Sequence, residues 1–173
     1  MFVLAAIQRT SFPISITERN EIMQEYTKLV GNEKFIGPMV RTLHRFNLNT
    51  SAGDVCIRNG SYAVTDKADG ERRMLFINND GRGYTIDIGM RIVFTGLRDL
   101  PRDVRNCLID GEFMPDINLF AGFDIYFFNK MDVRIQPLIH TERTKSNDST
   151  DRLSILRGII ETINETISGK KDV

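Results

Sequence analysis

The residues best suited to chemistry stand together in one short segment, residues 67–72, which reads KADGER. A lysine acts as a nucleophile only after losing its proton, so its ordinary pKa of about 10.4 must fall through burial or nearby cations. Arg72 lies five residues after Lys67 and could supply such a cation, or bind a phosphate or hydroxyl. Alternatively, Asp69 and Gly70 form a tight hairpin turn with solvated charges around it, and turn chemistry alone favours that explanation.

Two segments further along the chain combine acidic or aromatic residues with strand-like patterns. Residues 108–113 read LIDGEF and begin about forty residues after Lys67, and residues 122–128 read GFDIYFF. Each has a plain structural explanation: a turn after a buried strand for the first, and a core strand for the second.

The three segments resemble the signatures of the covalent nucleotidyltransferases, the superfamily of DNA ligases, RNA ligases and mRNA capping enzymes. Lys-x-Asp-Gly-x-Arg at residues 67–72 resembles the first signature. Asp-Gly-Glu at residues 110–112 resembles the second, and an aromatic residue before an aspartate at residues 123–124 resembles the third.

Within this superfamily, the chain looks most like the capping enzymes of large DNA viruses. The features that carry this likeness are residues 65–72 (TDKADGER) and residues 123–129 (FDIYFFN), followed by residues 132–134 (DVR) and Pro137. The likeness covers roughly residues 37–156. It implies that the chain comes from the guanylyltransferase domain of a capping enzyme.

This resemblance implies a two-step reaction. The lysine attacks the α-phosphorus of a nucleoside triphosphate, pyrophosphate leaves, and a lysine–nucleotide phosphoramide remains. The nucleotide is then transferred to the 5′-diphosphate end of an RNA to form the cap linkage. The implied nucleophile is Lys67, the implied substrates are GTP and 5′-diphosphate RNA, and the implied cofactor is Mg²⁺ or Mn²⁺.

The positions of the other residues within the signatures imply their roles. Arg72 and Glu112 are expected to bind the ribose hydroxyls, and Phe123 is expected to stack on the purine. Asp69 is expected to fix the turn and orient the lysine, although a purely structural role fits its position equally well. Arg91 falls where the family often places an arginine near the ribose and phosphates, but it could equally be a surface charge on a strand.

The pattern of apolar residues predicts the elements that hold these segments. A helix is expected at residues 15–31, capped by Ser15 or by Thr17 and stopped by Gly31. A second helix is expected at the end of the chain, and the whole predicts an α+β domain with antiparallel sheets and flanking helices. The remaining expectations are strands at residues 62–65, 73–77, 84–88, 91–94, 107–113 and 123–128, a turn at 78–81, an exposed loop at 141–150 and the second helix at 151–168.

The length of 173 residues fits a single domain, residues 1–173. The family resemblance implies more: a further strand with a glutamate, a Lys-x-Lys-type segment and an OB-fold domain, and nothing after Phe128 resembles these. We therefore expect a nucleotidyltransferase core that is incomplete on its C-terminal side, either a fragment or a degenerate relative, and inactive alone. Triphosphatase, OB-fold and methyltransferase domains or subunits are the implied partners.

Composition limits the other possibilities. Lys+Arg and Asp+Glu both number 23, so any contact with nucleic acid must rest on local charge. Cys56 and Cys107 are far apart and are expected to be buried free thiols, and the only histidines, His44 and His140, suggest no metal cluster. No apolar run is long enough to span a membrane, which predicts an intracellular, cytoplasmic protein, in a viral factory or a virion if it is viral.

Two other functions stay open from sequence alone. An ATP-dependent DNA or RNA ligase shares the core signatures, and the identity of the base that labels the lysine would separate it from a capping enzyme. A non-catalytic structural relative would keep the signatures without the reaction, and covalent labelling would identify that case.

Overall fold

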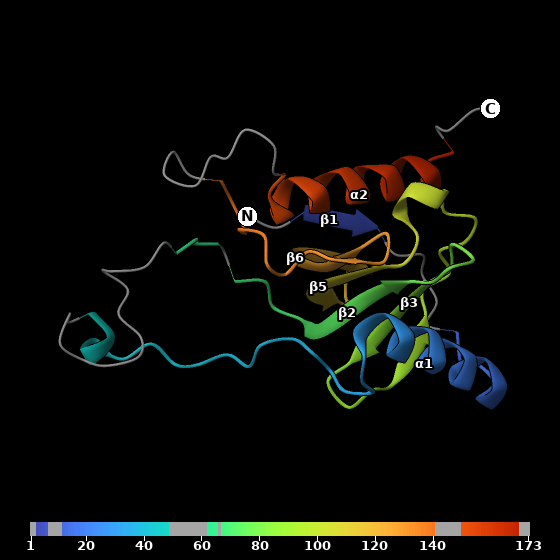
Figure 1. Cartoon of the computed structure of the whole chain (residues 1–173), viewed down its shortest axis with the longest axis horizontal. Helices are drawn as coiled ribbons and strands as arrows, with labels where there is room; N and C mark the ends of the chain where they lie inside the picture. Colours follow the sequence, from blue (N-terminus) through green and yellow to red (C-terminus); the bar gives the residue numbers. More distant parts are fainter. Residues whose placement is uncertain (1–2, 7–11, 49–61, 66, 141–149, 170–173) are drawn as a thin grey trace.

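The structure is a computed structural model and describes residues 3–6, 12–48, 62–65, 67–140 and 150–169. Two helices lie on opposite sides of one sheet (Figure 1). In chain order the elements are β1 (Val3–Ala6), α1 (Ile16–Val30), η1 (Arg45–Leu48), β2 (Glu71–Ile77), β3 (Gly83–Asp87), β4 (Ile92–Phe94), η3 (Arg102–Val104), β5 (Cys107–Met114), β6 (Leu119–Phe128), β7 (Met131–Asp132) and α2 (Arg152–Ile167).

The strands of the described residues pair antiparallel throughout, in the order β1-β6-β5-β2-β3-β4, and β7 adds to β6. The connection from β2 to β3 is the predicted turn at residues 78–81. The side-chain oxygen of Asn78 accepts hydrogen bonds from the backbone N–H groups of Asp80 and Arg82, and Gly81 takes a φ of 77°. The two strands that carry the first two signatures, β2 and β5, are therefore neighbours at the centre of the sheet.

Alternating residues of β2 show why the sheet is covered on both faces. Met74 and Phe76 pack into the cluster that contains Ile22 and Tyr26 of α1. Leu75 and Ile77, on the other face, pack into the cluster that contains Leu156, Ile160 and Ile163 of α2. Because both faces are buried, β2 is a continuous apolar run at its C-terminal end rather than an alternating one.

Both helices begin and end with side-chain or glycine caps. Ser15, rather than Thr17, caps α1, because its hydroxyl accepts from the backbone N–H of Glu18 at 3.1 Å. Gly31 ends α1 in the left-handed region, with a φ of 87°. The carboxylate of Asp151 caps α2 by accepting from the backbone N–H of Ser154 at 2.7 Å. These caps confirm the predicted bounds of the two helices to within a residue.

The α+β class and antiparallel pairing are confirmed, but three details of the prediction were wrong. Residues 62–65 are described but form no strand, and Tyr62 is 57% exposed and Val64 is 95% exposed. β6 begins at Leu119, four residues before the predicted start, and β1 and β7 were not predicted. Most of the loop predicted at residues 141–150 lies outside the described residues.

The cysteine and membrane expectations can be tested only in part. Cys107 is a free, fully buried thiol, and burial raises its pKa to about 12. Cys56 lies outside the described residues. None of the helices that the structure describes combines the length and the apolar character needed to cross a bilayer.

Candidate functional site

A cavity of about 1060 Å³ lies where the signature segments meet the start of α2. One side consists of the start of β2, Glu112 on β5, and Phe123 and Asp124 on β6. The other side comes from the residues around the start of α2, and residues 38–40 and 63–65 complete the lining. Lys67, Arg72, Glu112 and Phe123, four of the predicted site residues, line this one cavity.

Lys67 stands at the cavity in a solvated position. Its side chain is 84% exposed, and its Nζ donates a hydrogen bond to Oδ1 of Asp69 at 2.5 Å. This bond, and the attraction to Asp69, raise the pKa of Lys67 and lower the pKa of Asp69. A nucleophilic lysine needs the opposite shift in pKa, so in this conformation Lys67 is held in its protonated form. Asp69 is thus the direct partner of the lysine in this conformation.

Arg72 does not serve as the cation that lowers the pKa of Lys67. It forms a two-pronged ion pair with Asp110, in which Nε lies 3.2 Å from Oδ1 and Nη2 lies 2.6 Å from Oδ2. Its Nη1 donates to the backbone carbonyl of Pro38 at 2.6 Å. Asp110 is fully buried and also accepts from the hydroxyl of Tyr126 at 2.5 Å. Arg72 is therefore fixed in position at the cavity wall by a buried carboxylate.

Glu112 and Gly70 meet at the same wall. Arg72 and Glu112 are direct cross-strand partners, so their side chains share a face of the sheet. Burial, the largest influence, raises the pKa of Glu112, while the nearby backbone N–H of Gly70 acts in the opposite direction. A Cβ at position 70 would lie 2.4 Å from the carbonyl oxygen of Phe113. The glycine of the first signature is thus required by its close approach to β5, and it forms no hairpin turn.

Phe123 reaches the cavity because the pairing of β5 with β6 is irregular. Asp110 pairs with Asp124 and Gly111 pairs with Gly122, so Phe123 is an extra residue on β6. Such a bulge changes the direction in which a side chain points. The ring of Phe123 lines the cavity, 5.8 Å from the guanidinium carbon of Arg72.

The second signature, Asp-Gly-Glu at residues 110–112, lies inside β5, which continues to Met114. The alternative explanation of a turn at this signature is therefore wrong.

A second irregularity places Tyr126. Leu108 pairs with Phe127 and Ile109 pairs with Ile125, which leaves Tyr126 as another extra residue on β6. Its ring packs in the cluster beneath α1, and its hydroxyl reaches Asp110. Burial is the main cause that raises the pKa of Tyr126, so the hydroxyl stays protonated and donates to Asp110.

The start of α2 is tied to the cavity by Arg152. Its guanidinium binds the carboxylate of Asp124 through Nε at 2.7 Å and Nη2 at 3.1 Å. Its Nη1 donates to the backbone carbonyls of Arg134 and Gln136. One guanidinium thus joins β6, the segment after β7 and the helix. Arg157, further along α2, lines the cavity.

Arg91 is not brought to this site. It lies in the turn between β3 and β4, its side chain is exposed, and its backbone N–H donates to Asp87 at 2.9 Å. It is not among the described residues that line the cavity, which favours a surface charge over a ribose contact.

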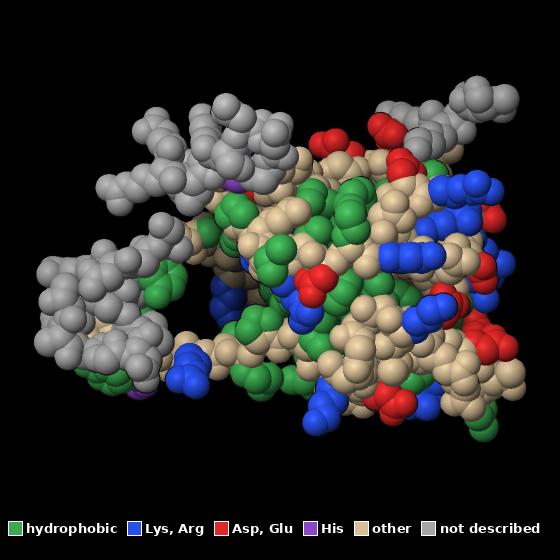
Figure 2. All heavy atoms as spheres, in the orientation of Figure 1, with side chains coloured by type: hydrophobic (Ala, Val, Ile, Leu, Met, Phe, Trp, Pro, Cys, Tyr) green, Lys and Arg blue, Asp and Glu red, His purple; other side chains and the backbone are tan. Residues whose placement is uncertain are grey.

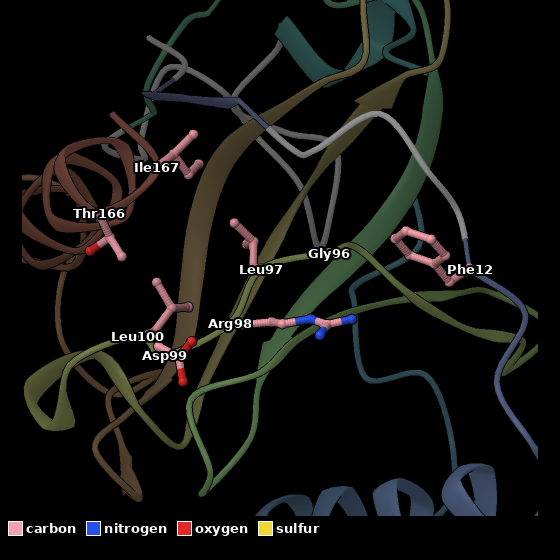
Figure 3. A pocket seen from close by; sticks show the side chains of 8 residues that line it. All are labelled: Phe12, Gly96, Leu97, Arg98, Asp99, Leu100, Thr166 and Ile167. Carbon is pink, nitrogen blue, oxygen red and sulfur yellow. The ribbon is translucent and has the colours of Figure 1, made fainter. Parts of the chain in front are cut away.

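A smaller cavity of about 420 Å³ lies elsewhere, between residues 96–100 and the end of α2 (Figure 3). Phe12, Arg98 and Thr166 border it, and none of the predicted site residues does.

Sequence reasoning missed the residues that support the site. Asp110 lies within the second signature, and an aspartate flanked by Ile109 and Gly111 on a buried strand signals a paired internal charge. Tyr126 gave no such signal, because its position depends on a bulge. Arg152 opens the last helix, and only the folded chain shows that it faces Asp124.

The arrangement suits a flat ligand with hydroxyl and phosphate groups. Phe123 offers an aromatic face, Glu112 offers a carboxylate acceptor, and Arg72 offers the two N–H donors that Asp110 and Pro38 leave unused. Lys67 offers an amine at the mouth of the same cavity. Among the described residues, no group of three or more His, Cys, Asp and Glu side chains could hold a metal ion.

No known family model matches the chain. A stretch of 134 residues, 76% of the chain, is 34% identical to the "Probable mRNA-capping enzyme" of Acanthamoeba polyphaga mimivirus. The matched stretch is only 11% of the length of that viral protein. The chain is thus a relative of the mRNA-capping enzymes of large DNA viruses, as its three signatures predict.

Proposed function

We propose that this chain contributes the nucleotide-binding and lysine-bearing part of an mRNA guanylyltransferase with the nucleotidyltransferase fold. The observation that supports this most directly is that Lys67, Arg72, Glu112 and Phe123 line one cavity. These residues come from three separate segments, and a merely structural origin of the signatures gives no reason for them to meet. The similarity to a viral protein named as a capping enzyme adds independent support.

In the proposed reaction, the neutral Nζ of Lys67 forms a bond to the α-phosphorus of GTP. The bond between that phosphorus and the bridging oxygen breaks, pyrophosphate leaves, and the lysine loses its remaining extra proton to solvent. The β-phosphate oxygen of 5′-diphosphate RNA then forms a bond to the same phosphorus, the phosphorus–nitrogen bond breaks, and Lys67 takes up a proton from solvent and leaves as an amine. An amine is needed here because an arginine keeps its proton at any workable pH.

The bond between Lys67 and Asp69 must open before the first step. It raises the pKa of Lys67, and a protonated amine has no electron pair to attack phosphorus. We propose that GTP brings Mg²⁺ or Mn²⁺ with its phosphates, since Mg²⁺ is held mostly by phosphates, water and one or two carboxylates. The exposed carboxylate of Asp69 would be one ligand for such a cation.

The other contacts follow from the cavity wall. Glu112 would accept from the ribose hydroxyls, and Arg72 would donate to the ribose through the N–H groups that Asp110 and Pro38 leave unused. Phe123 would stack on guanine. Triphosphatase, OB-fold and methyltransferase units are the proposed partners, and 5′-diphosphate RNA is the proposed acceptor.

The test is covalent labelling of the longest protein that the gene encodes around this chain. With α-labelled GTP and Mg²⁺, label should stay with the protein on a denaturing gel. Lys67→Arg should abolish the label while keeping the charge, and Lys28→Arg, on the exposed face of α1, should label as the unchanged protein does.

The same experiment separates the alternatives. Labelling by ATP in place of GTP would show a polynucleotide ligase. GTP binding without labelling by either nucleotide would show a non-catalytic relative. Labelling of the Lys67→Arg protein would refute Lys67 as the nucleophile.

A further inference from the structure

Residues 38–48, named here the arm, leave the body of the molecule after α1. Figure 1 shows the arm running away from the sheet and ending in the short helix η1. Ten of its eleven residues are exposed, and only Asn47 is partly covered. The first three residues of the arm, Pro38, Met39 and Val40, line the cavity. The rest of the arm neither lines the cavity nor takes part in the strand pairings described above.

The charge of the arm differs from that of the chain. The whole chain balances 23 basic against 23 acidic residues, but the arm carries Arg41 and Arg45 and no acidic residue. Figure 2 shows acidic side chains on the body of the molecule, interleaved there with the basic ones. The arm is thus a local positive segment on a neutral protein, and a local positive segment attracts a polyanion.

The tip of the arm also presents aromatic rings in a fixed arrangement. The rings of His44 and Phe46 are stacked, with centroids 5.2 Å apart and planes 12° from parallel. Two hydrogen bonds hold this turn: the His44 N–H donates to the side chain of Asn47 at 2.9 Å, and the Asn47 N–H donates to the His44 carbonyl at 2.9 Å. Phe46 remains 57% exposed, so a ring face is open to a ligand.

The base of the arm belongs to the site. The carbonyl of Pro38 accepts from Arg72, the arginine fixed on the cavity wall. From Val40, at the cavity, to Phe46 the chain can extend by at most about 22 Å. A ligand could therefore lie along the arm and place its end beside Lys67.

We propose that the arm binds the first nucleotides of a single-stranded RNA and directs the 5′ end into the cavity. This rests on the proposed guanylyltransferase function, because it is the 5′ end that must reach Lys67. Arg41 and Arg45 contact phosphates, and the His44–Phe46 pair stacks on a base, which is how single strands are held without sequence preference. The exposed apolar side chains of Met39 and Leu43 would also suit a protein partner. Binding of a protein through them would, however, leave Arg41 and Arg45 without a function.

The experiment measures the binding of residues 1–173 to a short 5′-diphosphate RNA, labelled at its 3′ end, by fluorescence anisotropy over a range of salt concentrations. The double variant Arg41→Gln with Arg45→Gln should weaken binding. It should also reduce the slope of log affinity against log salt by roughly 1.4, if each arginine contacts one phosphate of a single strand. Phe46→Ala should weaken binding roughly ten- to a hundredfold, and Phe46→Trp should restore most of it.

The matched control removes two exposed arginines from the body, Arg19→Gln with Arg102→Gln, and should leave the RNA affinity nearly unchanged. An equal loss in this control, or no loss in the arm variants, would overturn the proposal. So would a dimer in solution that Phe46→Ala dissociates while RNA affinity stays constant, because the arm would then be a protein interface. Covalent labelling by GTP needs no RNA and is measured separately, so its failure would refute the proposed function without being confused with failure of the arm.

Discussion

Arg72 on β2 and Asp110 on β5 are joined by a two-pronged ion pair across neighbouring strands, at 3.2 and 2.6 Å. The Asp110 side chain is fully buried, whereas the Arg72 side chain is 21% exposed and faces the cavity. Of the five N–H donors of a guanidinium, three are used by Asp110 and Pro38, which leaves one on each terminal nitrogen. The pair connects the buried centre of the sheet to the wall where a ligand would bind.

Removing Asp110 should therefore lower both stability and ligand binding. Asp110→Ala leaves the Arg72 charge and the Tyr126 hydroxyl without their partner, and breaking a buried pair costs about 3–5 kcal/mol. Urea unfolding followed by circular dichroism measures the loss. The control is Glu71→Ala, which breaks the pair with Arg73; Glu71 is 58% exposed, so the cost should stay below about 1 kcal/mol. Equal losses in the two variants would contradict the structural role of Asp110.

The pair between Lys67 and Asp69 predicts a pH effect on the reactivity of the amine. Asp69 raises the pKa of Lys67, so at a pH below that pKa a smaller fraction of Lys67 is neutral than for an ordinary lysine. Asp69→Asn should lower this pKa and increase modification of Lys67 by an amine-specific reagent near pH 9. The difference should vanish at a pH above both pKa values.

Mass spectrometry of the digested protein measures this modification residue by residue. Lys28, on α1, serves as an internal control and should react equally in both proteins. Slower modification of Lys67 in the Asp69→Asn protein would mean that Asp69 does not hold the lysine in its protonated form.

Local sequence rules were enough for the helices and most strands. Ser15 and Gly31 bound α1 because caps act over three or four residues, which a sequence displays directly. The same rules failed for residues 62–65, which are β-prone but form no strand in the described part of the chain. They also missed β1, because its pairing with β6 joins residues more than a hundred positions apart in the chain.

For the site as well, the local sequence predicted some features, and others depended on pairing between distant segments. The three signatures predicted Lys67, Arg72, Glu112 and Phe123 as site residues, and all four line one cavity. The pairing of Arg72 with Asp110 depends on the register of β2 against β5, and the bulge at Phe123 depends on the register of β5 against β6. Register is set by packing over the whole sheet, so it could not be read from either segment alone.

The ion pair between Arg152 and Asp124 should contribute more to the free energy of unfolding than the exposed ion pair between Arg134 and Asp132. Their side chains are 16% and 18% exposed, and Arg152 also binds two backbone carbonyls. Arg152→Lys keeps the charge but loses the fork, so we expect a loss of about 1–3 kcal/mol in the free energy of unfolding. Arg134→Lys is the matched control, because Arg134 and Asp132 are 43% and 42% exposed and their pair should be worth less than about 1 kcal/mol. Thermal unfolding of both variants measures the difference, and a larger loss for Arg134→Lys would contradict it.

Phe123 provides the sharpest test of the cavity as a nucleotide site. If its ring stacks on guanine, Phe123→Ala should weaken GTP binding roughly ten- to a hundredfold, since such stacking is worth about 1–3 kcal/mol. Phe123→Tyr and Phe123→Trp should recover most of the affinity, and Phe123→Leu should recover less, because leucine restores apolar area without an aromatic face.

The competing explanation is that Phe123 acts as a core residue of β6. The bulge argues against it, because the extra residue points to the cavity and the ring is only half-buried. A core role predicts that Phe123→Ala lowers the melting temperature and that GTP affinity falls only as the fold loosens. Calorimetric titration with GTP and thermal unfolding, made on the same four variants, separate the two explanations. A Phe123→Ala protein that melts normally and binds GTP with unchanged affinity would remove Phe123 from the site.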